Sequence, residues 1–343
     1  MKNVNVLKER IRKKKVFAGF DGYIDLLYSV VEGETGGEKE VFKESGEFVE
    51  NLIRTSGMSS EYEILLKERR IGGNAPLMSI GMASMGADVC CAGLFGENGE
   101  DLNLNVYSLG EPAVTIALEF QDCKYMLADR RGMETVTYEN LVHTMGEDAI
   151  QDKILQADLI AAVNWSAMPG LTEILEHLLD GDVQKQTEKK RWLYLDLSDI
   201  RARSAEQVKD YFRVIKKIAV YAGFSTCLSV NQNELEILED RYKIYGEKKE
   251  KLQKLRNCLQ IDELIYHGMS EAVFCTKEIL EKTKKQVFKD PVLTTGAGDN
   301  FNAGVCIGKL LDLSPKEQLE IGNRAAEFYV CHGCSAKLED VLN

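Results

Sequence analysis

A turn of small residues late in the chain has the composition of a phosphate-binding site. The segment Leu293–Gly304 reads LTTGAGDNFNAG, and the spacing of its apolar residues predicts a helix that starts near Asp299. Consecutive small residues let backbone N–H groups converge, and a helix N-terminus adds roughly half a positive charge. Together they could form an anion hole for phosphate oxygens, with Asp299 beside it as a base for an alcohol. The alternative is that Asp299 only caps the helix.

Two better-known phosphate motifs do not fit this chain. Gly296-Ala297-Gly298 lacks the third glycine of the dinucleotide fingerprint, and Gly308-Lys309-Leu310 lacks the hydroxyl residue and the spacing of a P-loop. No Gly-x-Gly-x-x-Gly follows the first expected strand, which argues against a nucleotide-dependent oxidoreductase.

Three earlier segments also combine glycine with carboxylate or amide side chains. The first follows an apolar strand, the second opens a helix, and the third ends a later strand: Gly19–Asp25 (GFDGYID), Gly72–Ala75 (GGNA) and Asn231–Glu234 (NQNE). In this order, and together with the late glycine turn, they resemble the signature segments of the PfkB/ribokinase family of carbohydrate and nucleoside kinases. The resemblance spans about residues 16–335.

The resemblance implies a phosphotransferase that uses ATP and Mg²⁺ and moves the γ-phosphoryl group to a hydroxyl of a small sugar or nucleoside. Asp299 would be the base, and Gly296, Ala297 and Gly298 would form the anion hole. The residues expected to bind the substrate are Asp21, Asp25, Gly72, Gly73 and Asn74. Carboxylates and amides suit sugar hydroxyls because each can make several hydrogen bonds. The alternative from another class is a non-catalytic sugar- or nucleotide-binding regulatory protein on the same fold.

The resemblance also places residues on the nucleotide side of the site. Asn231 and Glu234 would act near the metal and the phosphates, Glu234 on Mg²⁺ through water, because Mg²⁺ keeps much of its hydration shell. Asn231 can also be the N-cap of a helix. The other residues expected to line the nucleotide pocket are Thr295, Asn323 and Gly333. Leu293 stands where family members often carry an aspartate of a monovalent-cation site, which leaves a monovalent cation doubtful as a cofactor.

Composition excludes several classes of protein. The chain has 343 residues, of which 44% are hydrophobic and 29% charged, as in soluble globular proteins. A net charge of -12 would repel the phosphates of nucleic acid, so we expect no nucleic-acid partner. We expect no membrane partner either, because no apolar run approaches the roughly 20 residues of a membrane span. The N-terminus shows no signal peptide, and the nine scattered cysteines are typical of reduced thiols, so we expect a cytoplasmic protein.

The elements that must position these residues alternate between strands and helices, which is typical of a doubly wound parallel sheet. The expected strands are Val16–Phe20, Leu159–Val163, Trp192–Leu195, Thr226–Val230, Glu263–Tyr266 and Ala272–Cys275. The expected helices are Ala75–Met85, Leu171–Leu179, Ala205–Val220, 232–240, 245–259, 299–311 and 315–331. We therefore expect a single α/β domain over residues 1–343, ribokinase-like by the resemblance, with a mostly parallel sheet flanked by helices.

Two stretches depart from this alternation. Residues 24–31, 61–69, 112–120 and 122–129 have β character, and 42–57 looks helical. Such segments suit a small sheet beside the main one, so we expect a β-rich lid formed by two excursions of about 22–70 and 100–140. By the resemblance, the lid would close over the substrate, and the lids of two copies could pair in a homodimer.

Overall fold

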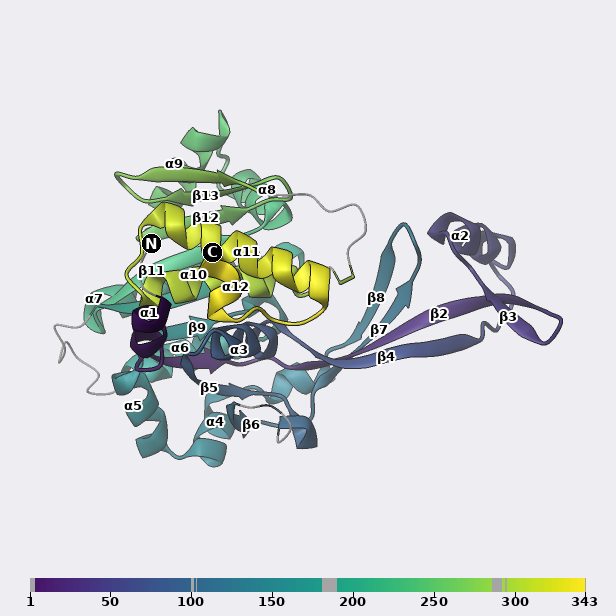
Figure 1. Cartoon of the computed structure of the whole chain (residues 1–343), viewed down its shortest axis with the longest axis horizontal. Coiled ribbons are helices and arrows are strands. Elements are labelled where there is room, and N and C mark those ends of the chain that lie inside the picture. Colours follow the sequence, from purple (N-terminus) through teal and green to yellow (C-terminus); the bar gives the residue numbers. More distant parts are fainter. Residues whose placement is uncertain are drawn as a thin grey trace.

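The computed structural model describes residues 4–99, 102, 104–180, 190–285, 292–293 and 295–342. These residues form a large sheet with helices on both faces and a small sheet that projects to one side (Figure 1). Helix α2 (Ser45–Arg54) lies at the far end of the small sheet. No helix in the described ranges combines the length and the apolar character needed to cross a membrane.

The large sheet contains nine strands within the described ranges, in the order β14-β13-β12-β11-β10-β9-β1-β5-β6. Only β13 runs antiparallel to its neighbours, so the expected doubly wound, mostly parallel sheet is confirmed. The strands are β1 (Lys15–Gly19), β5 (Asp88–Gly93), β6 (Asn105–Ser108), β9 (Leu159–Ala162), β10 (Arg191–Asp196), β11 (Phe224–Val230), β12 (Glu263–His267), β13 (Glu271–Cys275) and β14 (Leu280–Lys284). The chain order reverses around β1, and ligands of such sheets bind at the carboxyl ends of the strands near that point.

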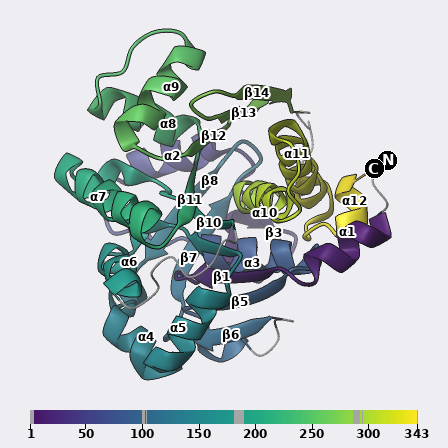
Figure 2. The ribbon, with the colours of Figure 1, turned by 90° about the vertical axis from the view of Figure 1, so that its left-hand side faces the viewer.

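Helices cover both faces of the large sheet (Figure 2). One layer consists of α4 (Tyr138–Met145), α5 (Glu147–Gln156), α6 (Leu171–Asp180), α7 (Ala205–Tyr221), α8 (Gln232–Arg241) and α9 (Lys248–Leu259). The other consists of α1 (Val4–Ile11), α3 (Asn74–Ser84), α10 (Ala297–Leu310), α11 (Pro315–His332) and α12 (Leu338–Leu342). Short 3-10 helices occur at Gly96–Gly99, Arg131–Thr135, Trp165–Ala167 and Ile200–Ala202.

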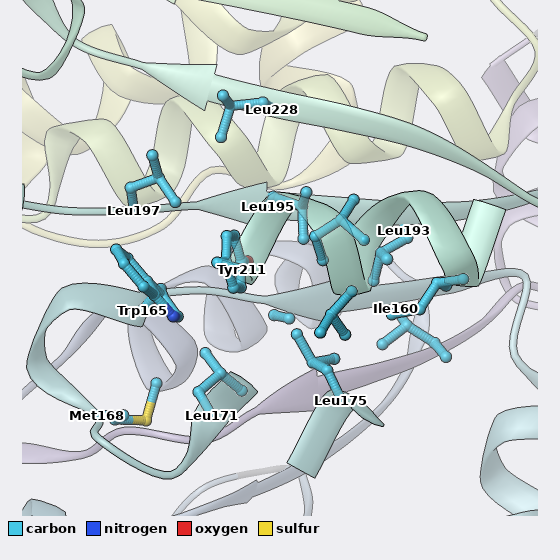
Figure 3. Close-up of a cluster of buried hydrophobic side chains, with 14 of the residues drawn as sticks. Ile160, Trp165, Met168, Leu171, Leu175, Leu193, Leu195, Leu197, Tyr211 and Leu228 are labelled. Atoms are coloured by element: carbon cyan, nitrogen blue, oxygen red, sulfur yellow. The ribbon is translucent and has the colours of Figure 1, made fainter. Parts of the chain in front are cut away.

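Side chains along each central strand alternate between these two layers, as strand geometry requires. Leu193 and Leu195 of β10 belong to the cluster that contains Trp165 and Tyr211, whose ring centroids are 4.7 Å apart (Figure 3). Trp192, on the same strand, belongs to the cluster on the opposite face. Because both faces are buried, strands such as β9 are apolar throughout rather than alternating.

The small sheet has the strand order β3-β2-β7-β8, and β4 also pairs with β2. Its strands are β2 (Tyr23–Thr35), β3 (Glu38–Val41), β4 (Ile64–Gly72), β7 (Ala113–Glu119) and β8 (Lys124–Asp129). All five lie in the two expected excursions. The second excursion contributes less than expected, because β6 pairs with β5 in the large sheet and α4 packs on that sheet. Residues 100, 101 and 103 of this excursion lie outside the described residues.

Candidate active site

The glycine turn begins helix α10. Gly296 has a φ of 95°, a left-handed conformation that favours glycine. A Cβ atom at this position would lie 2.8 Å from the Tyr329 hydroxyl, so a side chain does not fit. The N–H groups of the first helical turn have no partner inside the helix, and both Ala297 and Gly298 line a cavity. Two of the three expected anion-hole residues therefore line this cavity, and Gly296 directly precedes them. Thr294 of the same segment lies outside the described residues.

Asp299 lies in the first turn of α10, among carboxylates from distant parts of the chain. Burial and the charges of Asp196, Asp21, Glu234 and Asp25 raise the pKa of Asp299 well above its ordinary value. Asp299 is thus close enough to both aspartates that were expected to bind the substrate for their charges to raise its pKa. An ionised carboxylate with a raised pKa is a stronger proton acceptor than an ordinary one.

Asp21 follows β1 and caps helix α3. Its carboxylate accepts the backbone N–H groups of Asn74 at 2.8 Å and Ala75 at 2.7 Å. It also accepts the side-chain amide of Asn164 at 2.7 Å. Burial raises the pKa of Asp21. Since a carboxylate offers about four acceptor positions, Asp21 keeps roughly one for a ligand.

Asp25 lies in β2 beside the two glycines that precede α3. A Cβ on Gly72 would lie 2.5 Å from Oδ2 of Asp25, and a Cβ on Gly73 would lie 3.1 Å from Oδ2 of Asp21. Gly73 also has a φ of 98°, which favours glycine. Both glycines therefore make room for a carboxylate. The residues expected to bind the substrate come together around the N-terminus of α3.

Asn231 and Glu234 form a capping box at the start of α8. The Asn231 side chain accepts the backbone N–H of Glu234 at 3.0 Å and donates to the Glu234 carboxylate at 2.7 Å. The N-cap interpretation of Asn231 is therefore confirmed. Glu234 is 3% exposed, and burial and the charge of Asp196 raise its pKa well above the ordinary value. Within the described part of the chain, no three His, Cys, Asp or Glu side chains are placed to hold a metal ion by themselves.

The cavity at the glycine turn has a volume of about 1060 Å³. Its lining combines residues of β12, β14, α10 and α11 with a set of cations, Lys282, Lys284, Lys285, Lys316 and Arg324. Two buried polar atoms in its lining, Nε2 of His267 and Oδ1 of Asn323, have no hydrogen-bond partner among the described residues. Positive charge, free backbone amides and unpaired polar atoms fit a nucleotide and its phosphates.

Two residues expected at the nucleotide lie away from this cavity. Gly333 ends α11 in a left-handed conformation, with a φ of 70°, and a Cβ there would lie 3.6 Å from Val292. Thr295 lines a second cavity of about 1130 Å³, between Val292 and the small sheet. Asn323, by contrast, lines the first cavity.

Sequence reasoning missed Asp196 as part of the site. Asp196 ends β10, is 5% exposed, and accepts the Asn302 side chain at 2.9 Å. Burial and the charge of Asp21 raise the pKa of Asp196 to about 6. The available signal was its place at the carboxyl end of the expected strand Trp192–Leu195, which is where ligands of doubly wound sheets bind.

Comparison with known sequences finds similarity to ketohexokinases. The family model described as prokaryotic ketohexokinase matches residues 2–343. A curated ketohexokinase from Haloferax volcanii is 26% identical over 340 residues, which cover 95% of this chain and 89% of that protein.

Comparison with solved structures identifies the fold. The ribokinase of Thermotoga maritima matches with a TM-score of 0.64 at 15% identity and covers 96% of this chain and 97% of that one. A nucleoside kinase of Methanocaldococcus jannaschii matches with a TM-score of 0.61 at 15% identity, over 96% of this chain and 97% of its own. The expected ribokinase-like fold is therefore confirmed.

Proposed function

The chain belongs to the prokaryotic ketohexokinase family, and from that premise we propose that it transfers the γ-phosphoryl group of ATP to a hydroxyl of a ketohexose. It is a PfkB-type carbohydrate kinase, which narrows the acceptor from a sugar or nucleoside to a sugar. The observation that carries the proposal is the position of Asp299, one helical turn from Gly296 and in electrostatic contact with Asp21 and Asp25.

Asp299 acts as the base. The sugar hydroxyl gives its proton to the Asp299 carboxylate while its oxygen bonds to the γ-phosphorus and the bond to the β-phosphate oxygen breaks. The raised pKa of Asp299 suits this role, because the carboxylate holds the proton more strongly than a solvated aspartate would.

The turn at Gly296, Ala297 and Gly298 stabilises the charge on the phosphoryl group through backbone N–H groups and the N-terminus of α10. Bound Mg²⁺ would supply further positive charge on the phosphates. Glu234 and Asn231 would hold it through water, since their own oxygens are engaged in the capping box.

The sugar binds beside α3. Asp25 and Asn74 make its main hydrogen bonds, and Asp21 chiefly fixes the N-terminus of α3 because most of its acceptor positions are filled. The small sheet closes over the sugar as a lid and excludes water, which limits ATP hydrolysis.

The nucleotide occupies the cavity of about 1060 Å³. Lys285 and His267 lie next to the anion hole, where both contact the ring of Phe301. Lys285 Nζ is 4.4 Å from the centroid of this ring, and the His267 ring stacks on it with a centroid distance of 5.0 Å. Asn323 lies further along the same cavity and offers its unpaired Oδ1 to a donor on the base.

A second copy of the chain covers the outer face of the small sheet, which is the face that carries Leu26 and lies opposite the face of Asp25. Leu26, Ile116 and Leu127 are paired across three strands on this face, and Leu127 is 56% exposed. Leu66, on the same face, is 55% exposed. An exposed apolar patch of this kind is typical of an interface. All nine cysteines are free thiols, which supports the cytoplasm as the location.

The test is acceptor-dependent ADP formation. The purified chain is incubated with ATP, Mg²⁺ and one acceptor at a time, chosen from ketohexoses, aldohexoses and nucleosides. We expect ADP release with a ketohexose and a background rate without one. A chain that binds these sugars but releases no ADP with any of them would instead be the non-catalytic binding protein.

A further inference from the structure

Arg70 lies on the face of the small sheet that is turned toward the active site. In the pairing of β2 with β4, Arg70 stands directly opposite Asp25. Residues directly opposite each other in antiparallel strands project from the same face of a sheet. Its neighbour Arg69 stands opposite Leu26 and therefore projects from the outer face.

The Arg70 side chain is largely buried, and one nitrogen of its guanidinium group lacks a hydrogen-bond acceptor. Its side chain is 14% exposed, and Nη1 has no hydrogen-bond partner among the described residues. Nη1 forms a long ion pair with Oε2 of Glu68, at 3.9 Å, which is beyond hydrogen-bonding distance. A guanidinium presents five donors, and a buried donor without an acceptor is costly. Such a group is suited to an anionic ligand.

Tyr329 links the surroundings of Arg70 to the glycine turn. Its charge acts on Asp25 and on Tyr329, lowering the pKa of each against the effect of burial. The Tyr329 hydroxyl in turn lies 2.8 Å from the position that a Cβ on Gly296 would take. Tyr329 therefore lies next to Gly296 and close enough to Arg70 to respond to its charge.

Transfer of a phosphoryl group beside the carboxylates around Asp299 requires a compensating positive charge. The charges that act most strongly on Asp299 all belong to carboxylates. A phosphoryl group moving past them is itself anionic, and its charge spreads over its three outer oxygens during transfer. Lys124, another cation that acts on Asp25, is paired with Glu119 at 2.5 Å. Among the described residues Arg70 is paired only with Glu68, at the longer distance of 3.9 Å, so it is the better placed of the two to compensate this charge.

We propose that Arg70 is a catalytic residue that donates hydrogen bonds to the outer oxygens of the phosphoryl group in transfer, from the side opposite the Gly296 turn. The inference rests on the proposed kinase function and adds one contact to it. No covalent bond to Arg70 forms: the sugar oxygen bonds to phosphorus, ADP leaves, and the proton goes to Asp299. Because Arg70 belongs to the small sheet, movement of that sheet couples sugar binding to stabilisation of the phosphoryl group.

The experiment compares Arg70→Ala and Arg70→Lys with Arg69→Ala as the matched control on the opposite face. We expect Arg70→Ala to lower kcat about 10²–10³-fold, with the KM for the sugar changed less than about threefold. Arg70→Lys should keep part of the activity, because lysine restores the charge but not the planar pair of donors. Added guanidinium ion should restore part of the kcat of Arg70→Ala. Arg69→Ala should keep the wild-type kcat.

Three outcomes would overturn the inference. In one, Arg70→Ala keeps its kcat. In another, the only kinetic effect of Arg70→Ala is a raised KM for the sugar, which would make Arg70 a positioning residue for Asp25. In the third, guanidinium ion and Arg70→Lys give no recovery although circular dichroism shows a folded protein. If Arg70→Ala does not fold, Arg70→Lys alone carries the test, and an unchanged kcat refutes the role. A wild-type chain that forms no ADP with any sugar refutes the kinase function itself, which is a distinguishable result.

Discussion

The carboxylate of Asp21 accepts the backbone N–H of Asn74 at 2.8 Å, and so joins the end of β1 to the start of α3. The bond fixes the relative position of two segments that are far apart in the chain. It also changes the interpretation of Asp21, which was expected to bind a sugar. Most of the acceptor positions of its carboxylate are already occupied by donors of the protein itself.

Asp21→Ala should therefore reduce stability more than it changes sugar recognition. It leaves the N–H groups of Asn74 and Ala75 without their acceptor, which we expect to lower the free energy of unfolding by about 1–3 kcal/mol. Asp25→Ala is the matched comparison: it should raise the KM for the sugar with a smaller loss of stability. Urea unfolding and steady-state kinetics measure both. Equal unfolding midpoints for the two variants would contradict this division of roles.

Asp299→Asn should separate catalysis from nucleotide binding. We expect kcat to fall about 10²–10⁴-fold, while the Kd for ATP stays within a few-fold of the wild type. Calorimetric titration with nucleotide and a coupled ADP assay measure the two quantities. A variant with full kcat would remove Asp299 as the base.

The same variant should unfold at a higher temperature at neutral pH. Burial and neighbouring carboxylates raise the pKa of Asp299 in the folded chain, so its ionised form destabilises the fold, and asparagine removes that cost. The stability that the protonated carboxyl contributes is complete below the unfolded value near pH 4 and is lost as the pH rises. The gain in Tm should therefore grow as the pH rises from about 4 toward neutral. Scanning calorimetry across this range checks the sign, and a Tm difference that is independent of pH would count against it.

Gly296→Ala and Gly298→Ala should behave differently although both lie in the same turn. A Cβ on Gly296 would meet the Tyr329 hydroxyl at 2.8 Å and Leu77 Cδ1 at 2.9 Å, at a φ of 95°. A Cβ on Gly298 would meet only His267 Cε1, at an ordinary 3.5 Å. We expect Gly296→Ala to lose about 10²-fold or more in kcat and about 1–2 kcal/mol of stability from the left-handed backbone. Gly298→Ala should keep a Tm close to that of the wild type. Similar losses in both variants would show that the turn tolerates no methyl group at all.

Nucleotide affinity should depend on the protonation of Lys285. Burial lowers the pKa of Lys285 to about 8, and phosphate would favour the charged form and raise that pKa in the complex. The Kd for ATP should therefore be lowest below pH 8 and rise by up to about tenfold per pH unit above it. Lys285→Met should weaken binding and remove this dependence. The control is Lys254→Met, because Lys254 does not line the cavity, is 55% exposed and is paired with Glu250 at 3.8 Å. If the dependence persists in Lys285→Met, another group is responsible.

The outer face of the small sheet should determine the oligomeric state. We expect the wild type to have twice the chain mass of 38.5 kDa in light scattering after size exclusion. A charge in the apolar patch, Leu66→Glu or Leu127→Glu, should yield monomers because it would be desolvated in the interface. Val220→Glu is the control, since Val220 is 54% exposed on α7, which packs on the large sheet rather than on the small one. A monomeric wild type at micromolar concentration would refute the dimer.

Much of the scaffold follows from local patterns in the sequence. The apolar strands on either side of β10, the helices between them and the glycine turn before Asp299 are predicted because each depends on neighbours within about ten residues. The capping box of Asn231 and Glu234 is equally local, since three residues set it. The two β-rich excursions are visible for the same reason, but the strands β3, β5, β6 and β14 were not expected.

The tertiary structure alone decides which side chains share the cleft. In the sequence, Asp196 is an ordinary polar residue at the end of a strand. In the fold, α10 packs against β10 and buries Asp196, and this burial raises its pKa to about 6. Arg69 and Arg70 are indistinguishable in the sequence, because the face on which each lies depends on the register of β4 with β2. Local sequence determines where the chain turns, whereas burial and charge depend on every segment that packs around a residue. For that reason the candidate chemistry was visible in the sequence, but its electrostatic setting was not.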